Sequence, residues 1–287
     1  MNRHWLIALL LTAVCAGVSA QRTDFLGRSH LLLGGDATFY IGDLNNQSAL
    51  SVPRWGVSAG LHTRLDNRWS VRVELSYGML ECTHDYIVRR NLSFRSSLME
   101  GAAVVEFDFR PYGPGATESR WTPYIFGGLG VYHFSPEALR TEADGSSRWV
   151  ALRDLHTEGQ GTSAYPERRP YQLTQLCLPF GVGFRCRLGK SVSLSAEYGF
   201  RKTWTDYIDD VSTTYVGSAL LSAEVENGGL AGIMADRSGE VEEGYVNAAG
   251  IKRGDDSLND WYSFFTIRVG FSLETLLGWT RSKRCKL

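Results

Sequence analysis

The sequence predicts an all-β fold, namely an eight-stranded antiparallel transmembrane outer-membrane β-barrel with short periplasmic turns and long extracellular loops. Three observations predict it. Segments of about ten to fourteen residues alternate apolar and polar side chains, which is the two-residue period of a β-strand. Short and long connections between these segments alternate along the chain. Finally, Trp69, Phe109 and Trp261 stand near the ends of apolar faces, as in the aromatic girdles of membrane barrels.

Composition excludes two other classes of protein. The 287-residue chain has 30 Lys and Arg against 31 Asp and Glu, a formal charge of −1, and so lacks the basic surface that a nucleic-acid binder needs. Beyond residue 20 no apolar run approaches the roughly 18–20 residues of a membrane-spanning helix. We therefore expect neither a nucleic-acid partner nor a helical membrane domain.

The first twenty residues are predicted to be a signal peptide. Arg3 and His4 precede an apolar run at residues 5–14, and residues 18–20 (VSA) offer small side chains before Gln21. This layout is typical of a cleaved secretory signal rather than of a membrane anchor. We expect a single barrel domain at residues 21–287, located in the outer membrane of a Gram-negative cell.

The first four expected strands cover residues 30–40, 54–65, 68–80 and 96–109. In each, apolar side chains at every second position alternate with residues that are mostly polar or small. The apolar positions are Leu31, Leu33, Ala37 and Phe39; Trp55, Val57, Ala59 and Leu61; Trp69, Val71, Val73, Leu75, Tyr77 and Met79; and Met99, Ala103, Val105, Phe107 and Phe109. Each segment thus has one face for lipid and one for the barrel interior.

The last four expected strands cover residues 121–134, 175–188, 191–201 and 261–273. The segment at 121–134 is glycine-rich and apolar on both faces, so the sequence leaves its orientation open. In the other three the alternating apolar residues are Leu176, Leu178, Phe180, Val182, Phe184 and Cys186; Val192, Leu194, Ala196, Tyr198 and Phe200; and Phe265, Ile267, Val269 and Phe271. A basic periplasmic tail at residues 274–287 is expected to follow.

Connection lengths favour a membrane barrel over a soluble one. The short connections are residues 66–67, 110–120 and 189–190, and the longer ones are 41–53, 80–95, 135–174 and 202–260. Outer-membrane barrels place short turns in the periplasm and long loops outside the cell. The alternative is a soluble sandwich or lipocalin-like barrel with its apolar face inward. Strands of this length disfavour it, because strands in soluble sheets usually have about five or six residues.

The polar faces are predicted to hold a structural network of charges. Its expected members are Arg72, Glu74, Glu100, Glu106, Arg185, Arg187, Glu197, Arg201 and Arg268. Because an isolated buried charge is costly, we expect these side chains to pair across the narrow lumen. We hypothesise that the network closes the barrel, so that it conducts no ions.

Candidate catalytic chemistry is sparse. The chain has no serine nucleophile elbow, phosphate loop, HExxH or EF-hand pattern. His133 and Ser135 at the outer end of one strand are the one pair that suggests a lipid-modifying hydrolase, and an interfacial role is the favoured interpretation. We expect no enzymatic activity, no cofactor, no metal and no small-molecule substrate. The sequence leaves open the state of the cysteines after cleavage, which are Cys82, Cys177, Cys186 and Cys285.

Two other charged clusters are candidate contact sites. Asp206, Asp209 and Asp210 open the longest loop and have the hard oxygens that calcium prefers. Loop capping, or pairing with Arg201 and Lys202, is the favoured interpretation of these aspartates. The tail is a candidate contact for a periplasmic partner or for anionic headgroups. Its basic residues are Arg281, Lys283, Arg284 and Lys286.

Several segments, taken in order, resemble the PorG-like outer-membrane barrels of Bacteroidota. They are residues 42–45 (GDLN), 91–96 (NLSFRS), 122–128 (TPYIFGG), 155–161 (LHTEGQG), 178–185 (LPFGVGFR), 197–201 (EYGFR), 206–215 (DYIDDVSTTY) and 259–262 (NDWY). The resemblance covers most of the chain beyond the signal peptide. The candidate loop-motif residues within it are Glu158, Gln160, Asp206, Tyr207, Asp209 and Asp210.

The resemblance implies a component of the type IX protein secretion system, a machine that also serves gliding motility. In that system PorG is the outer-membrane partner of the periplasmic PorK–PorN ring. The family brings no catalytic residues to carry over. The alternative function is a surface-exposed barrel of the OmpA/OmpX kind, whose long loops mediate adhesion or ligand binding. Either way, outer-membrane lipid is an expected partner.

Overall fold

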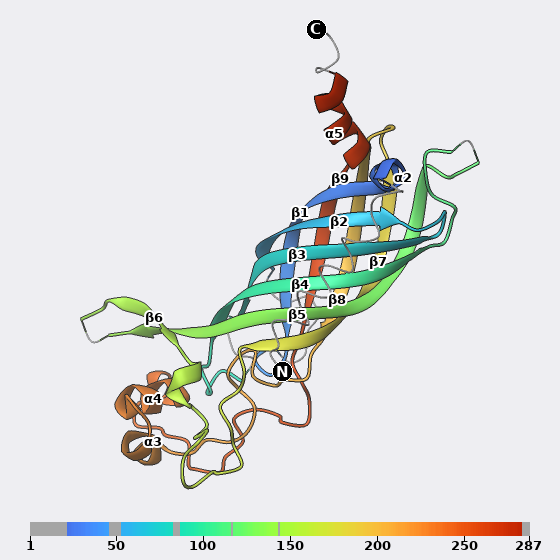
Figure 1. Cartoon of the computed structure of the whole chain (residues 1–287). Coiled ribbons are helices and arrows are strands. Elements are labelled where there is room, and N and C mark those ends of the chain that lie inside the picture. The colour runs from blue at the N-terminus through green and yellow to red at the C-terminus, as the bar shows by residue number, and fades with distance from the viewer. Residues whose placement is uncertain (1–21, 46–52, 83–86, 116, 143, 283–287) are drawn as a thin grey trace, which may run out of the picture.

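The computed structural model describes residues 22–45, 53–82, 87–115, 117–142 and 144–282 (Figure 1). The predicted signal peptide lies outside these residues, as do Lys283, Arg284, Cys285 and Lys286. Of the other three cysteines expected in the mature chain, Cys177 and Cys186 are free thiols, and the buried Cys82 Sγ donates to the Leu44 carbonyl oxygen at 3.5 Å.

Within the described residues, eight strands close into one antiparallel barrel. They are β1 (Ser29–Ile41), β2 (Arg54–Arg64), β3 (Trp69–Cys82), β4 (Phe94–Asp108), β5 (Trp121–Thr141), β7 (Thr174–Arg187), β8 (Val192–Lys202) and β9 (Trp261–Ser272). Each barrel strand pairs with the next one along the chain, and β1 pairs with β9. Closure leaves no open sheet edge, which a lipid environment requires. The predicted fold class is confirmed.

The apolar faces of the strands point outward and the charged faces inward. On β3, Leu75 is 68% exposed, whereas its neighbours Arg72 and Glu74 are 2% and 4% exposed. The structure also settles the orientation of the segment at 121–134. Leu129 points outward and is 66% exposed, while Phe126 is buried in the lumen. A soluble barrel would show the opposite arrangement, with its aliphatic side chains converging on a dry interior.

Glycines on β7 make room for the aromatic side chains of β5 inside the barrel. A Cβ atom at Gly183 would collide with the ring of Tyr124, and one at Gly181 would collide with the ring of Phe126. Both rings are buried. The glycines of this strand therefore make room for the bulky side chains of their pairing partners on the neighbouring strand β5.

The structure departs from the expected boundaries around residue 135. The sequence predicts that the fifth strand ends at 134 and that 135–174 is a loop. Instead β5 continues to Thr141 and pairs with a ninth strand, β6 (Ser147–Ala151), outside the barrel wall. Ala138 and Val150 face each other in this hairpin and are both buried in a small apolar core. Burial of these two side chains against the long loops stabilises the extension of β5 beyond residue 134.

Short helices occupy segments that the sequence leaves as loops or tails. α3 (Ser218–Glu224) and α4 (Gly228–Ala235) lie in the longest connection, α2 (Arg22–Arg28) precedes the barrel, and α5 (Leu273–Ser282) forms much of the expected basic tail. Among the described helices none is long and apolar enough to cross a membrane.

The two ends of the barrel differ (Figure 1). α2, α5 and the tight turns lie at one end, while β6, α3, α4 and the long connections gather at the other. We call the end with short turns periplasmic, because outer-membrane barrels place short turns there. The packed long connections at the opposite, extracellular end are called the lobe below.

A charge in the middle of the outer face is expected to destabilise the barrel more than one at its rim. Leu75 lies halfway along β3, whereas the similarly exposed Leu188 follows β7 at a tight turn. Leu75→Arg should lower the free energy of unfolding by about 2–4 kcal/mol and Leu188→Arg by about 0–1 kcal/mol. Denaturant titration of the barrel folded into lipid vesicles measures both. Equal losses would contradict the placement of this face in hydrocarbon.

Candidate functional site

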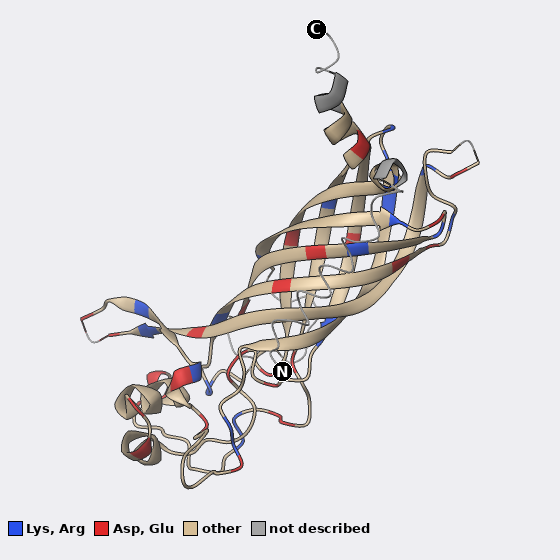
Figure 2. Ribbon diagram, in the orientation of Figure 1, with Lys and Arg blue, Asp and Glu red and all other residues tan. Residues whose placement is uncertain are grey.

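Ion pairs fill the middle of the barrel, where acidic and basic positions face each other on different strands (Figure 2). Arg72 lies among three carboxylates: its guanidinium nitrogens are 2.9 Å from Glu197 Oε2, 3.1 Å from Glu106 Oε1 and 3.6 Å from Glu74 Oε2. Arg268 shares two of these partners, with Nε 2.6 Å from Glu74 and Nη1 3.2 Å from Glu197. All five side chains are buried. Each carboxylate therefore finds a positive partner that offsets its desolvation.

Two further arginines extend this network along the barrel axis. Toward the lobe, Arg201 Nε lies 3.1 Å from Glu100 Oε2. Toward the periplasmic end, Arg185 pairs with Glu106, and its Nε lies 3.4 Å from Asp108 Oδ1. The network thus runs through much of the length of the lumen.

Aromatic rings pack against the arginines and fill the remaining space. The Arg185 guanidinium lies 3.9 Å from the centroid of Tyr124, and that of Arg201 lies 4.3 Å from the centroid of Phe264. The cavity beside Arg185 measures about 30 Å³, roughly the volume that one water molecule occupies in the liquid. Side chains pack this part of the lumen and leave little free volume.

Arg187 lies apart from the network of which the sequence predicts it to be a member. It is half-buried at the periplasmic end of β7, where its Nη1 donates to the carbonyl oxygen of Gly113 in the turn at 110–120. Within the described residues no carboxylate lies within 4.0 Å of its guanidinium. The strand ends there, so the side chain reaches the turn instead of the opposite wall.

Loop residues far apart in the sequence form a buried polar plug at the extracellular end. Arg253 is at its centre, with Nη1 2.9 Å from Glu158 Oε1 and Nη2 3.7 Å from Asp210 Oδ2. The Glu158 carboxylate also accepts the backbone N–H groups of Ser212 and Thr213, each at 2.9 Å. These contacts join the connection at 142–173 to the connection at 203–260.

The side chains of the 155–161 and 206–215 motifs point into this plug. Gln160 Oε1 accepts the backbone N–H of Glu158 at 3.1 Å, and the Tyr207 hydroxyl donates to Glu158 Oε2 at 3.2 Å. Asp210 accepts hydroxyl protons from Thr157 at 2.5 Å and Tyr171 at 2.7 Å. The motif residues therefore bind one another.

Asp206, Asp209 and Asp260 form an acidic group beside the plug. The Tyr40 hydroxyl donates to Asp209 Oδ2 at 2.5 Å, and Asp260 Oδ2 accepts the backbone N–H of Ile208 at 2.8 Å. Burial raises the pKa of Asp206 to about 9 and that of Asp209 to about 8, and it raises the pKa of Asp260 as well. Near neutral pH Asp206 and Asp209 are therefore largely protonated, which reduces the repulsion of clustered charges.

The aspartates of the longest loop do not pair with Arg201 and Lys202 as one interpretation of the sequence expects. Arg201 bonds Glu100 instead, while Asp209 Oδ1 accepts the N–H of Val211 at 2.9 Å, a loop-capping contact. Within the part of the chain that the structure describes, no group of three or more His, Cys, Asp and Glu side chains is arranged to hold a metal ion.

His133 and Ser135 do not form a nucleophile and base pair. His133 Nδ1 lies 2.9 Å from Thr174 Oγ1, on the exposed outer side of the barrel, and the Ser135 backbone N–H donates to Ser96 Oγ at 2.9 Å. These contacts join neighbouring strands at the rim.

Sequence reasoning misses Arg253, the central cation of the plug, and Tyr40. Nothing in the pattern around Arg253 distinguishes it from other loop residues, because its partner Glu158 is distant in the chain. Tyr40 stands two residues before the 42–45 motif, and Asp260 lies inside the 259–262 motif. Proximity to those motifs is the signal that could have identified both.

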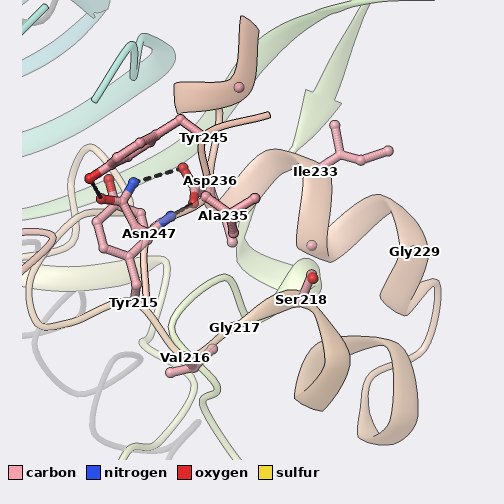
Figure 3. A pocket seen from close by; sticks show the side chains of 13 residues that line it. Tyr215, Val216, Gly217, Ser218, Gly229, Ile233, Ala235, Asp236, Tyr245 and Asn247 are labelled. Carbon is pink, nitrogen blue, oxygen red and sulfur yellow. Dashed lines mark hydrogen bonds between the residues drawn. The ribbon is translucent and has the colours of Figure 1, made fainter. Parts of the chain in front are cut away.

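The lobe contains a second candidate site, a cavity of about 240 Å³ beside α4 (Figure 3). At its edge Asp236 accepts the backbone N–H of Asn247 at 2.7 Å and its side-chain amide at 2.9 Å, and the Tyr245 hydroxyl donates to Asn247 Oδ1 at 3.4 Å. These polar groups are thus engaged with one another. Several glycines and the half-exposed Ile233 form much of the remaining lining.

The match to one protein-family model agrees with this architecture. Residues 6–220 match the family model described as the outer membrane protein beta-barrel domain, whereas no curated protein matches the sequence. Similar solved structures include Ail of Yersinia pestis, at 9% identity over 85% of this chain and 97% of that chain with a TM-score of 0.38. Neisserial surface protein A shares 13% identity over 84% and 96% of the chains, with a TM-score of 0.39. OprG of Pseudomonas aeruginosa shares 9% over 85% and 96%, with a TM-score of 0.37.

Removing one partner of a lumen ion pair is expected to cost more stability than removing both. Arg201→Met leaves Glu100 buried without its cation and should lower the free energy of unfolding by about 3–5 kcal/mol. The double variant Arg201→Met/Glu100→Met should recover most of this loss, because two apolar side chains replace the pair. Arg148→Met, which breaks an exposed pair with Glu142, is the control and should cost at most about 1 kcal/mol.

Denaturant titration in lipid vesicles gives all three values. A double variant less stable than Arg201→Met alone would contradict the account of the lumen.

The plug is expected to lose stability as pH rises. The ordinary pKa of an aspartate is 3.8, whereas the folded values of Asp206 and Asp209 are about 9 and about 8. Between these limits the folded state binds more protons than the unfolded state, so the free energy of unfolding falls with rising pH. Amide hydrogen exchange at residues 208–212, corrected for intrinsic rates, should be faster at about pH 8.5 than at about pH 5.5.

Asp209→Asn stays neutral and should weaken this pH dependence. Asp255→Asn, at an exposed carboxylate, is the matched control and should leave it unchanged. Equal exchange of the native protein at both pH values would refute the protonated plug.

Proposed function

This chain belongs to the outer membrane protein beta-barrel domain family, and from that premise we propose that it is a non-enzymatic, non-conducting anchor barrel of the PorG-like kind in a type IX protein secretion system. In this role the barrel holds a periplasmic assembly of the PorK–PorN type at the outer membrane. The proposal has two parts, a closed barrel and a periplasmic partner.

The observation that carries the proposal is the place of the PorG-like segments in the fold. Residues 155–161, 206–215 and 259–262 lie far apart in the sequence, yet their side chains meet in one buried plug. These segments occur in the same order as in the PorG-like barrels, and they also contact one another in the folded chain. Together the two observations support a PorG-like barrel better than isolated motifs do. The packed lumen below the plug supports a static anchor over a transport path.

The periplasmic end is the side on which such an anchor meets its partner. It presents the turn at 110–120, the tight turns and α5, which carries Arg281. The other basic residues of the tail, Lys283, Arg284 and Lys286, lie outside the described residues. The described basic side chains of Arg187 and Lys190 at this end suit an acidic periplasmic protein.

The lobe favours a second candidate function, that of a surface barrel which binds a ligand or another cell through its loops. The cavity in Figure 3 and the exposed side chains of Ile233 and Val246 at its rim are the observations that favour it. The two functions use opposite ends of the molecule, so they can be separated by experiment.

Deleting the protein is expected to abolish export of type IX cargo, and PorK and PorN should co-purify with the tagged barrel in mild detergent. A lobe-shortened variant serves as the control. The Tyr215 N–H donates to the Ile251 carbonyl at 2.9 Å, and the Gly250 N–H donates to the Tyr215 carbonyl at 2.8 Å. The ends of residues 217–249 therefore lie close together, and a short glycine linker can join Val216 to Gly250.

The anchor role predicts that this variant restores cargo export in the deletion strain. Normal export after deletion, together with adhesion that is lost when the lobe is shortened, would reject the anchor role in favour of the surface barrel. Cargo in the medium and mass spectrometry of the purified complex are the two measurements.

A further inference from the structure

A polar cavity of about 390 Å³ opens at the periplasmic mouth of the barrel. The inner faces of β1, β2, β7 and β8 contribute to its wall, together with the turn at 110–120 and the first turn of α5. The charged and titratable residues of its lining are His30, Arg64, Tyr112, Arg187, Lys190 and Glu274. Its volume is within the roughly 300–1,000 Å³ typical of ligand pockets.

Positive charge predominates in this cavity. Three permanent cations, Arg64, Arg187 and Lys190, line the cavity with one carboxylate, Glu274, and a second carboxylate, Glu118, lies 3.8 Å from Arg64 behind the lining. Within the described residues neither Arg187 nor Lys190 has a carboxylate within 4.0 Å, and the Arg187 guanidinium donates to the backbone carbonyl of Gly113. A guanidinium with carbonyl contacts keeps its full charge for an incoming anion.

The third cation, Arg64, is fixed in place by the turn at 110–120. Its Nη1 donates to the Tyr112 carbonyl at 2.9 Å and lies 3.8 Å from Glu118 Oε1. A Cβ atom at Gly113 would collide with this guanidinium, so the glycine allows the turn to close over it. The buried Arg64 Nε has no hydrogen-bond acceptor, which leaves donor capacity at the cavity.

The acidic groups deeper in the lumen do not neutralise these cations. A second cavity of about 30 Å³ shares His30 and Arg64 with the first and reaches Glu106. Glu106 is already paired with Arg72 and Arg185. The lining of the larger cavity also includes the hydroxyl groups of Ser191, Ser193, Ser272 and Thr275. These groups are neutral hydrogen-bond donors.

From this arrangement we infer that the periplasmic mouth is a binding site for a carboxylate-bearing peptide segment of a periplasmic protein. Guanidinium groups bind carboxylates in bidentate geometry, and the hydroxyls add neutral donors. A peptide is favoured over a lipid phosphate because the lining consists of lumen-facing positions, whereas lipid headgroups surround the outer rim. The inference deepens the proposed function and rests on it for the existence of a periplasmic partner.

The binding test uses the full chain in detergent and an acetylated tetraglutamate peptide as the probe, with a tetraglutamine peptide as the neutral counterpart. Calorimetry should show binding of the acidic peptide, and the peptide should protect Lys190 from chemical acetylation as read by mass spectrometry. Arg187→Gln is expected to raise Kd about tenfold and Lys190→Gln about threefold. Arg120→Gln, at an exposed arginine of the same turn outside the cavity lining, should leave Kd unchanged.

Three outcomes would overturn the inference: equal binding of the neutral peptide, an equal loss in Arg120→Gln, or inorganic phosphate binding as tightly as the peptide. The last would identify a small-anion site instead. Lys190 is exposed, so Lys190→Gln tests the site even where Arg187→Gln fails to fold.

Co-purification from cells distinguishes failure of this inference from failure of the proposed function. PorK and PorN that co-purify with the native barrel but not with Arg187→Gln/Lys190→Gln would support both. If PorK and PorN also co-purify with that variant, the binding site is rejected and the anchor role remains intact. If PorK and PorN do not co-purify with the native barrel, while the barrel still binds the acidic peptide in detergent, the anchor role alone is rejected.

Discussion

The narrow lumen imposes the constraint on which the rest of this structure depends. Eight strands enclose a space only as wide as the side chains that enter it, and here many of those side chains are charged. Arg72 on β3 contacts Glu106 on β4 and Glu197 on β8, so one guanidinium joins strands from different parts of the wall. Closure of the barrel brings the charges together, and their pairing in turn favours one register of the strands.

The extracellular end must also offset the cost of burying charged groups, and it does so by different chemistry. In the lumen, arginines balance carboxylates, whereas in the plug much of the acidity is removed by protonation. Burial raises the pKa of Asp206 and Asp209, and the two oxygens of Asp209 accept hydrogen bonds from the Tyr40 hydroxyl and the Val211 backbone N–H. Arg253 is the central cation, and Glu158 is its nearest carboxylate. These hydrogen bonds act together with an apolar core in which Tyr171, Ile208 and Val211 of the loops pack with Phe94, Phe134 and Phe264 of the strands.

The contrast between the two ends connects the fold to the proposed function. The lobe end is closed by residues that bind one another, so little of the plug is free to act on a ligand. The periplasmic mouth keeps Arg187 and Lys190 without carboxylate partners in the described structure, around a cavity that opens along the barrel axis. A barrel closed on one side and cationic on the other is better suited to holding a periplasmic protein than to moving a solute.

The sequence by itself determined which way most strands face, because alternation is a local property of the chain. Leu75 outside and Arg72 inside follow from the two-residue period alone. The number of barrel strands and the approximate place of each follow from the same pattern. The segment at 121–134 is the exception, since its inward residues Tyr124 and Phe126 are as apolar as its outward ones.

Only the tertiary structure decided how distant residues pair. Arg187 follows Arg185 by two residues, and both were expected in the network, yet only Arg185 reaches Glu106. The partnership of Arg253 with Glu158 spans two connections that no periodicity relates. The extension of β5 to Thr141 likewise depends on its hairpin partner β6. The register of neighbouring strands, the closure of the barrel and the positions at which strands end determine which residues pair. These are relations between segments, so the sequence pattern of any single segment does not reveal them.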